Sequence, residues 1–301
     1  MPPPDTLLER KVLLRSIAST AVLGVLGIVW GIASGSQMIL LDGVYAIVGI
    51  ALSMLLLRAS TLAGHSPSRR FPYGREAATP LAIAVQGFVL LGTLIYAAVE
   101  AVATIREGGS TVTAVWAIAY GVIVTIASVA VWWWLQRVAG HSDLLVSEAT
   151  GWAVASLRGV GMVVGFVVLA ALTGSTWSRA APYIDPTMVL VTCVLLVWPP
   201  IGMVRDTVTE LLEGAPSDSV SGPVMEAIAS VRGQFDLDEP EVYMTKVGPK
   251  LYVEIDGTAG PGVTIAQLHE VRLALLERLE PLPYEVWLNV ELQPRTTDHT
   301  T

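Results

Sequence analysis

The chain is poor in charge, in cysteine and in basic residues, and each shortage excludes a class of protein. Only 15% of its 301 residues are charged, whereas a soluble globular chain carries about 25%, so an ordinary soluble domain is excluded. Its one cysteine, Cys193, cannot form an intramolecular disulfide. The 18 basic residues are outnumbered by 26 acidic ones, so nucleic acid is not expected as the main partner.

Motifs of enzymatic chemistry are also absent from the sequence. It contains no phosphate-binding glycine loop with a following lysine, no HExxH and no nucleophile elbow. We therefore do not expect an enzyme, and the sequence indicates no cofactor.

Long apolar runs are what the sequence has instead. A helix of about 20 apolar residues crosses a ~30 Å hydrocarbon core. Six stretches reach that length: 12–32, 38–57, 78–101, 112–135, 144–172 and 186–204. Only SGSQ separates the first two, which predicts a tight antiparallel pair of helices. The first run is too long for the apolar part of a signal peptide, so we expect it to remain in the mature chain.

The distribution of charge predicts the orientation in the membrane. Residues 1–205 carry nine acidic and twelve basic side chains, whereas residues 206–301 carry seventeen acidic and six basic ones. Arginine and lysine gather in the N-terminal segment and in the loop between the second and third spans. Because basic loops stay on the cytoplasmic side, the pattern predicts a multi-pass protein of the cytoplasmic membrane with both termini in the cytoplasm.

After the sixth span the pattern changes to that of a small α+β domain. It predicts an amphipathic helix, two strands joined by a turn at Gly248 and Pro249, a helix capped by Thr264 and a last strand, in the order αββαβ. We therefore expect a cytoplasmic segment at 1–11, a six-helix transmembrane domain at 12–205, a cytoplasmic domain at 206–294 and a disordered tail at 295–301.

Three stretches carry a resemblance to a known family. They are SGSQMILLDGVYAIVGIALSMLLLRAS in the second span, FPYGREAATPLAIAVQG after it, which is similar to an HPYGHGRAE motif, and GVTIAQLHEVRLALLERL with the closing VELQP. Together with the order of elements, they resemble the cation diffusion facilitator family of metal/proton antiporters. The resemblance implies a divalent cation such as zinc and protons as substrates, and a homodimer in the lipid bilayer.

The resemblance also implies a site of four ligands between the second and fifth spans, and this chain departs from it. Asp42 is kept, but Ala46, Gly151 and Ala155 stand at the other three positions. Small residues spaced by four also suit close helix packing in a membrane. This face of the fifth span can therefore be either an altered binding site or a surface that packs against another helix.

The cytoplasmic metal positions of the family are also reduced. In the loop, Phe71 and Arg75 stand where the family has histidines. In the C-terminal domain His269 matches a ligand position, and Glu291 and Gln293 stand where a histidine and an acid are usual. His269 and Glu291 are thus the candidate metal ligands there.

Asp42 is the strongest single candidate, because an aspartate inside an apolar span is costly unless it has a partner. Arg158 lies on the face of the fifth span that carries Ala155, three residues further along. We predict that its guanidinium neutralises Asp42 as a tethered cation where relatives hold a metal, preferably through two parallel hydrogen bonds. Tyr45 is a candidate weak oxygen ligand, and Glu148 a candidate cation or proton relay at the inner mouth.

The favoured interpretation is a divalent cation exporter, coupled to protons, with an altered transport site. A non-transporting family member that acts as a regulatory or scaffolding membrane partner is the alternative, and transport of another solute is a third possibility.

Overall fold

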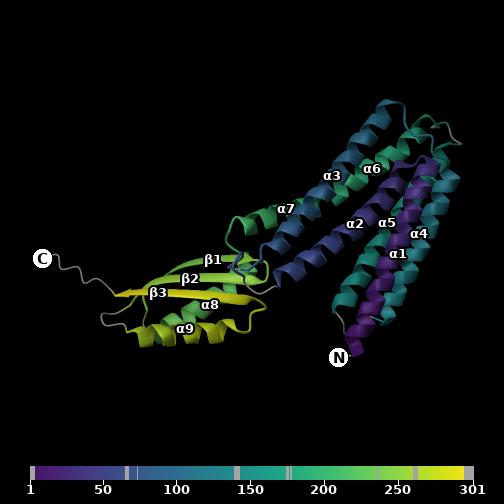
Figure 1. Ribbon diagram of the computed structural model, residues 1–301. Helices are drawn as coiled ribbons and strands as arrows, with labels where there is room; N and C mark the ends of the chain where they lie inside the picture. The colour runs from purple at the N-terminus through teal and green to yellow at the C-terminus, as the bar shows by residue number, and fades with distance from the viewer. Residues whose placement is uncertain are drawn as a thin grey trace. The chain divides into compact units, whose positions relative to one another are not determined.

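Six helices are long and apolar enough to cross a membrane in the computed structural model (Figure 1). The structure describes residues 4–64, 68–72, 74–138, 143–173, 176, 178–235, 237–259 and 264–294. The first five spans are α1 (Pro4–Ser34), α2 (Gln37–Ala63), α3 (Ala78–Arg106), α4 (Ala114–Val138) and α5 (Asp143–Thr173). Large apolar side chains remain exposed along these helices, as expected of surfaces that face lipid. The prediction of a multi-pass, six-span membrane protein is confirmed.

The helices begin and end at somewhat different residues from those predicted. α1 already includes residues 4–11, which we had expected to form a separate segment. The sixth span consists of η1 (Ser178–Tyr183), α6 (Ile184–Leu196) and α7 (Trp198–Leu211), so it starts before and ends after the predicted 186–204. The break between α6 and α7 directly precedes Pro199 and Pro200, which fit the first turn of a helix but not its interior.

Contacts divide the chain into two compact units. One comprises residues 1–55 and 86–201, and the other comprises residues 56–85 and 202–301. The loop between the second and third spans therefore groups with the C-terminal residues. The predicted tail at 295–301 lies outside the described residues.

Glycines let the helices of the first unit approach closely. A Cβ atom on Gly43 of α2 would stand 2.5 Å from the backbone nitrogen of Ile28 in α1. A Cβ on Gly159 of α5 would stand 2.5 Å from the Thr125 hydroxyl of α4. Figure 1 shows α4 and α5 side by side with α1 next to them. These two glycines flank Asp42 and Arg158 in the sequence, so close packing brings α2 and α5 within side-chain reach at that level.

The second unit contains a three-stranded sheet covered on one face by helices. Strand β2 (Lys250–Ala259) lies between β1 (Glu241–Val247), which is antiparallel to it, and β3 (Glu285–Pro294), which is parallel. Side chains of α8 (Asp218–Phe235) and α9 (Ile265–Leu279) pack on Leu251, Val253 and Ile255. Thr264 caps α9 in a capping box with Gln267. The predicted αββαβ order is confirmed.

The turn between β1 and β2 is held by two carboxylates. Glu210 of α7 accepts a hydrogen bond of 2.6 Å from the backbone N–H of Gly248. Glu76, which precedes α3, accepts one of 2.7 Å from Lys250. Gly248 has a φ of 59°, and a Cβ there would stand 2.6 Å from the Glu76 carbonyl oxygen. A glycine is therefore required where this turn meets the segment before α3.

Candidate functional site

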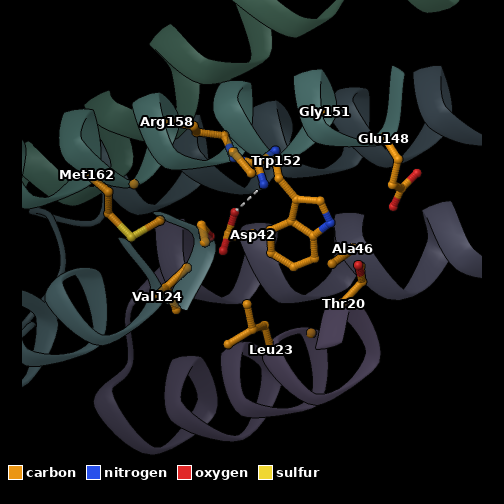
Figure 2. A pocket seen from close by; sticks show the side chains of 14 residues that line it. Thr20, Leu23, Asp42, Ala46, Val124, Glu148, Gly151, Trp152, Arg158 and Met162 are labelled. Carbon is orange, nitrogen blue, oxygen red and sulfur yellow. Dashed lines mark ion pairs between the residues drawn. The ribbon is translucent and has the colours of Figure 1, made fainter. Parts of the chain in front are cut away.

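A cavity of about 220 Å³ lies among α1, α2, α4 and α5, all within the first unit. Asp42 and Arg158 both line it (Figure 2). So do Ala46, Gly151 and Ala155, the three positions where the family resemblance implies the missing ligands. Small side chains stand there in place of carboxylates and imidazoles, and the space they leave is part of the cavity.

Asp42 has a partner for each of its two carboxylate oxygens. Arg158 Nη2 lies 3.1 Å from Oδ1, and the Tyr120 hydroxyl of α4 donates a hydrogen bond of 3.1 Å to Oδ2. The Asp42 side chain is only 10% exposed and that of Arg158 33% exposed. Arginine keeps its charge in proteins, so the guanidinium compensates the carboxylate in surroundings where an unpaired charge is costly.

The ion pair differs in one respect from the prediction. We expected two parallel hydrogen bonds from Arg158, but one guanidinium nitrogen reaches Asp42 and Tyr120 takes the other oxygen. Tyr120 is fully buried and its ring lies 6.0 Å from that of Trp30. A Cβ on Gly27 would stand 2.6 Å from the Tyr120 hydroxyl, so this glycine leaves room for it.

Sequence reasoning missed Tyr120. A tyrosine in an apolar span is usually a packed aromatic residue, and its spacing in the sequence carries no sign of a polar partner. The one available signal was that a buried tyrosine hydroxyl usually has a hydrogen-bond partner, and this does not say which residue it is.

Glu148 lines the same cavity from the N-terminal part of α5. The hydroxyl of Ser16 in α1 donates a hydrogen bond to Glu148 Oε1, and the indole N–H of Trp152 donates one of 2.6 Å to the Ser16 oxygen. Figure 2 shows Glu148 on one side of Trp152 and the Asp42–Arg158 pair on the other. The cavity thus contains two carboxylates in different surroundings.

Tyr45 is not among the residues that line the cavity. It packs against the main apolar core of the first unit. The residue one position further along α2, Ala46, faces the cavity instead, because residues four apart on a helix share a face more closely than residues three apart. Tyr45 thus lies beside the cavity wall, and its role as a weak oxygen ligand stays a prediction.

The packing seam predicted on α5 is present only in part. Gly159 packs closely on Thr125 of α4, whereas a Cβ on Gly151 would meet nothing within 4 Å. Gly151 and Ala155 instead face the cavity. The stripe of small residues therefore changes from a packing surface to a cavity wall along the helix.

His269 and Glu291 do not come together in the second unit. Val290 and Leu292 of β3 pack with α9, so Glu291 between them points to the opposite face of the sheet. His269 is exposed on α9, the helix that covers the other face. The two residues cannot share one ion, and among the described residues no group of three or more histidine, cysteine or acidic side chains could hold a metal.

Asp185 is a second buried carboxylate that the sequence did not single out. It lies in the first turn of α6, fully buried. Ser36 donates a hydrogen bond of 2.6 Å to it, and the backbone N–H groups of Gln37 and Met38 donate two more, of 2.9 and 3.4 Å. Asp185 thereby satisfies free amides at the start of α2. We had placed the start of the sixth span at residue 186, so this aspartate seemed to lie in a loop.

Comparison with known proteins gives two findings. The family model for the cation efflux transmembrane domain matches residues 13–212. The zinc transporter ZitB of Escherichia coli (strain K12) and that of Shigella flexneri are each 26% identical to this chain over 210 residues. These alignments cover 68% of this chain and 63% of each transporter, so the match spans less than two thirds of the relatives' length.

Proposed function

This chain belongs to the cation efflux family, and on that premise we propose that it transports a divalent metal cation across the membrane in exchange for protons. The observation that carries the proposal is the cavity among four membrane-spanning helices with the carboxylate of Asp42 in its wall. The zinc transporters that resemble the chain support a metal substrate. The basic N-terminal segment and the basic loop before α3 support cytoplasmic termini, and the family resemblance supports a homodimer.

Arg158 is proposed to act as a tethered cation. While it pairs with Asp42, the site is electrically neutral and a metal ion is not needed there. For a metal to bind Asp42, the guanidinium has to move away, and its long side chain allows this. Metal affinity at Asp42 is then reduced by the cost of breaking the ion pair, which favours rapid release over tight binding.

Proton movement is proposed to be coupled through the same competition. A cation that displaces Arg158 adds positive charge to an apolar region, and counter-movement of protons offsets that charge. Asp42 is the residue at which the metal and Arg158 compete, because its carboxylate lies 3.1 Å from the guanidinium.

Reconstitution into proteoliposomes tests the proposal. Purified protein is assayed for flux of Zn, Mn, Co, Fe and Cd together with a pH-sensitive dye inside the vesicles. We expect metal-dependent proton flux with at least one ion and its loss in Asp42→Asn, which keeps the size of the side chain. Glu107→Gln, which removes an exposed carboxylate outside the cavity, is the matched control. Equal flux in Asp42→Asn and in the unaltered protein would place the pathway elsewhere.

One observation favours a second candidate function. Arg158 neutralises Asp42 at the position where relatives hold a metal, as suits a family member that no longer transports and serves as a regulatory membrane partner. No flux with any of the five ions from folded protein would support this alternative. Recovery of flux after co-reconstitution with a transporting family member would identify it as part of a hetero-oligomer.

A further inference from the structure

Glu148 differs from Asp42 because, in the part of the chain that the structure describes, no lysine or arginine pairs with it. The Ser16 hydroxyl donates a hydrogen bond to Glu148 Oε1, and the Ser16 oxygen accepts one from the indole N–H of Trp152, which can only donate. Ser16 is fully buried and Trp152 is nearly so, which holds this chain of donors in place.

The second carboxylate oxygen of Glu148 is left without a partner. Within the described ranges, no lysine or arginine forms an ion pair with Glu148, and Oε2 has no hydrogen-bond donor. Glu148 lines the cavity together with the hydroxyl-bearing residues Thr20 and Ser128. Figure 2 shows the Thr20 hydroxyl on the same side of Trp152 as Glu148. A carboxylate in a cavity wall, with one oxygen not engaged by a hydrogen bond among the described residues, is suited to bind a cation.

Distance separates this position from the Asp42–Arg158 pair. Glu148 and Arg158 are ten residues apart on α5, which corresponds to about 15 Å along a helix axis. A cation at Glu148 therefore does not need Arg158 to move. The small residues Gly151 and Ala155 face the cavity between the two levels, so the space between them is not filled by large side chains from α5.

We propose that Glu148 binds a divalent cation of the oxygen-preferring class, such as Mn²⁺ or Mg²⁺, at a waiting position while Arg158 still occupies Asp42. Glu148 offers a carboxylate oxygen, and the hydroxyl-bearing Thr20 and Ser128 also line the cavity. Oxygen ligands suit hard cations better than the nitrogen and sulfur donors typical of zinc sites. The role as a waiting position rests on the proposed transport function, whereas the binding itself does not. The proposal gives the substrate class that the geometry at Asp42 leaves open.

Binding of Mn²⁺ to the full chain in detergent tests the proposal, with the free ion measured by electron paramagnetic resonance. Glu241→Gln with Glu291→Gln serves as the background, because those exposed carboxylates lie together on the sheet and would bind Mn²⁺ weakly. We expect one bound ion per chain in this background and at least tenfold weaker affinity after Glu148→Gln. Glu148→Asp keeps the charge and retains part of the affinity, whereas Glu107→Gln leaves it unchanged.

Unchanged Mn²⁺ affinity in Glu148→Gln, or no bound ion in the background protein, would overturn the proposal. Gel filtration and thermal unfolding of each variant show that a loss of binding does not reflect misfolding. Flux in proteoliposomes separates the two proposals. If flux persists and Glu148→Gln leaves Mn²⁺ binding unchanged, the waiting position is wrong and the proposed transport function stands. If Mn²⁺ binding depends on Glu148 but no flux is found, the binding site stands and the proposed transport function is wrong.

Discussion

Two ion pairs in this molecule have carboxylates that are similarly covered, and they differ in what surrounds them. Asp42 and Arg158 meet at 3.1 Å in the first unit, among membrane-spanning helices. Glu76 and Lys250 meet at 2.7 Å in the second unit, outside those helices. The two carboxylate side chains are similarly covered, at 10% and 12% exposure. The difference lies in the alternatives available to a charge once its partner is removed.

A charge left behind in the second unit has other partners nearby. Lys250 also lies 3.7 Å from Glu285, and the adjoining turn is held independently by Glu210. Among the described residues, the partner that remains for a charge left behind at Asp42 is the neutral hydroxyl of Tyr120. Exposure alone therefore does not rank these pairs, because the free-energy cost of breaking each pair depends on access to water and on additional partners.

The largest expected effect comes from breaking the membrane pair on one side only. Asp42→Ala and Arg158→Ala each leave an unpaired charge among apolar helices, and each is expected to lower the free energy of unfolding by about 3 kcal/mol. The double variant removes both charges and is expected to be more stable than either single variant. Thermal unfolding in detergent and expression level measure this. A double variant no better than the singles would show that the two residues do not depend on each other.

Lys250→Met is the matched change in the second unit. It is expected to lower the free energy of unfolding by about 1 kcal/mol, less than Arg158→Ala, because Glu76 can be hydrated once its partner is removed. Hydrogen exchange of the backbone amides at 246–250 in the full chain is the measurement, and faster exchange there is expected. Lys11→Met removes an exposed lysine and should leave these amides unchanged. If Lys250→Met lowered the free energy of unfolding as much as Arg158→Ala does, the surroundings of the two ion pairs would not explain their difference.

Acid is expected to open the second unit by weakening the same pair. Burial raises the pKa of the Glu76 carboxyl, but its hydrogen bonds, above all that from Lys250, and the charge of Lys250 offset this and leave the pKa below its usual range. The hydrogen bond to Glu76 raises the pKa of Lys250 above its usual range. A lowered carboxyl pKa stabilises the fold above the unfolded value of about 4.3, and this contribution is lost as the pH falls below it.

The measurement is the exchange rate at 246–250 as a function of pH, after correction for intrinsic exchange. Protection should fall below about pH 4.3 in the unaltered chain, and Glu76→Gln should abolish that step. The raised lysine pKa stabilises the fold at lower pH and loses its contribution as the pH rises through the folded value. A protection profile without an acid step would show that Glu76 does not hold the turn.

The smallest effect is expected where like charges meet on the open face of the sheet. Asp256 is paired in register with both Glu241 and Glu291. Partial desolvation and the neighbouring carboxylates raise the pKa of Asp256. Since a raised carboxyl pKa means that the fold loses stability as the acid ionises, Glu291→Gln is expected to raise the melting temperature slightly at pH 7. Glu277→Gln on the exposed surface of α9 is the control, and an equal change there would exclude repulsion within the row as the cause.

Much of the architecture could be predicted because it depends on local patterns. The lengths of the apolar runs gave six spans, and the alternation around Leu251, Val253 and Ile255 gave a strand with one covered face. The ends of the sixth span were less predictable, because Asp185 looks like a loop residue until its hydrogen bonds with Ser36 and the start of α2 are known. Polar groups buried between distant segments do not follow from hydropathy.

The candidate site was predictable only where one residue requires another. An aspartate in an apolar span needs compensation, and Arg158 was the cation at a suitable level, so the sequence predicted the pair that the structure contains. Tyr120 and the chain from Trp152 through Ser16 to Glu148 join residues more than 70 positions apart. No periodicity or spacing relates such residues to each other.

The sequence by itself thus determined the spans, the αββαβ order and the need for a partner at Asp42. Each follows from the free-energy cost of exposing apolar groups to water or of placing a charged group in hydrocarbon. Only the tertiary structure decided which face of α5 forms a cavity, which oxygen of Asp42 meets Tyr120, and on which sides of the sheet His269 and Glu291 lie. Those outcomes depend on how closely the helices approach one another and on which residues their side chains then meet.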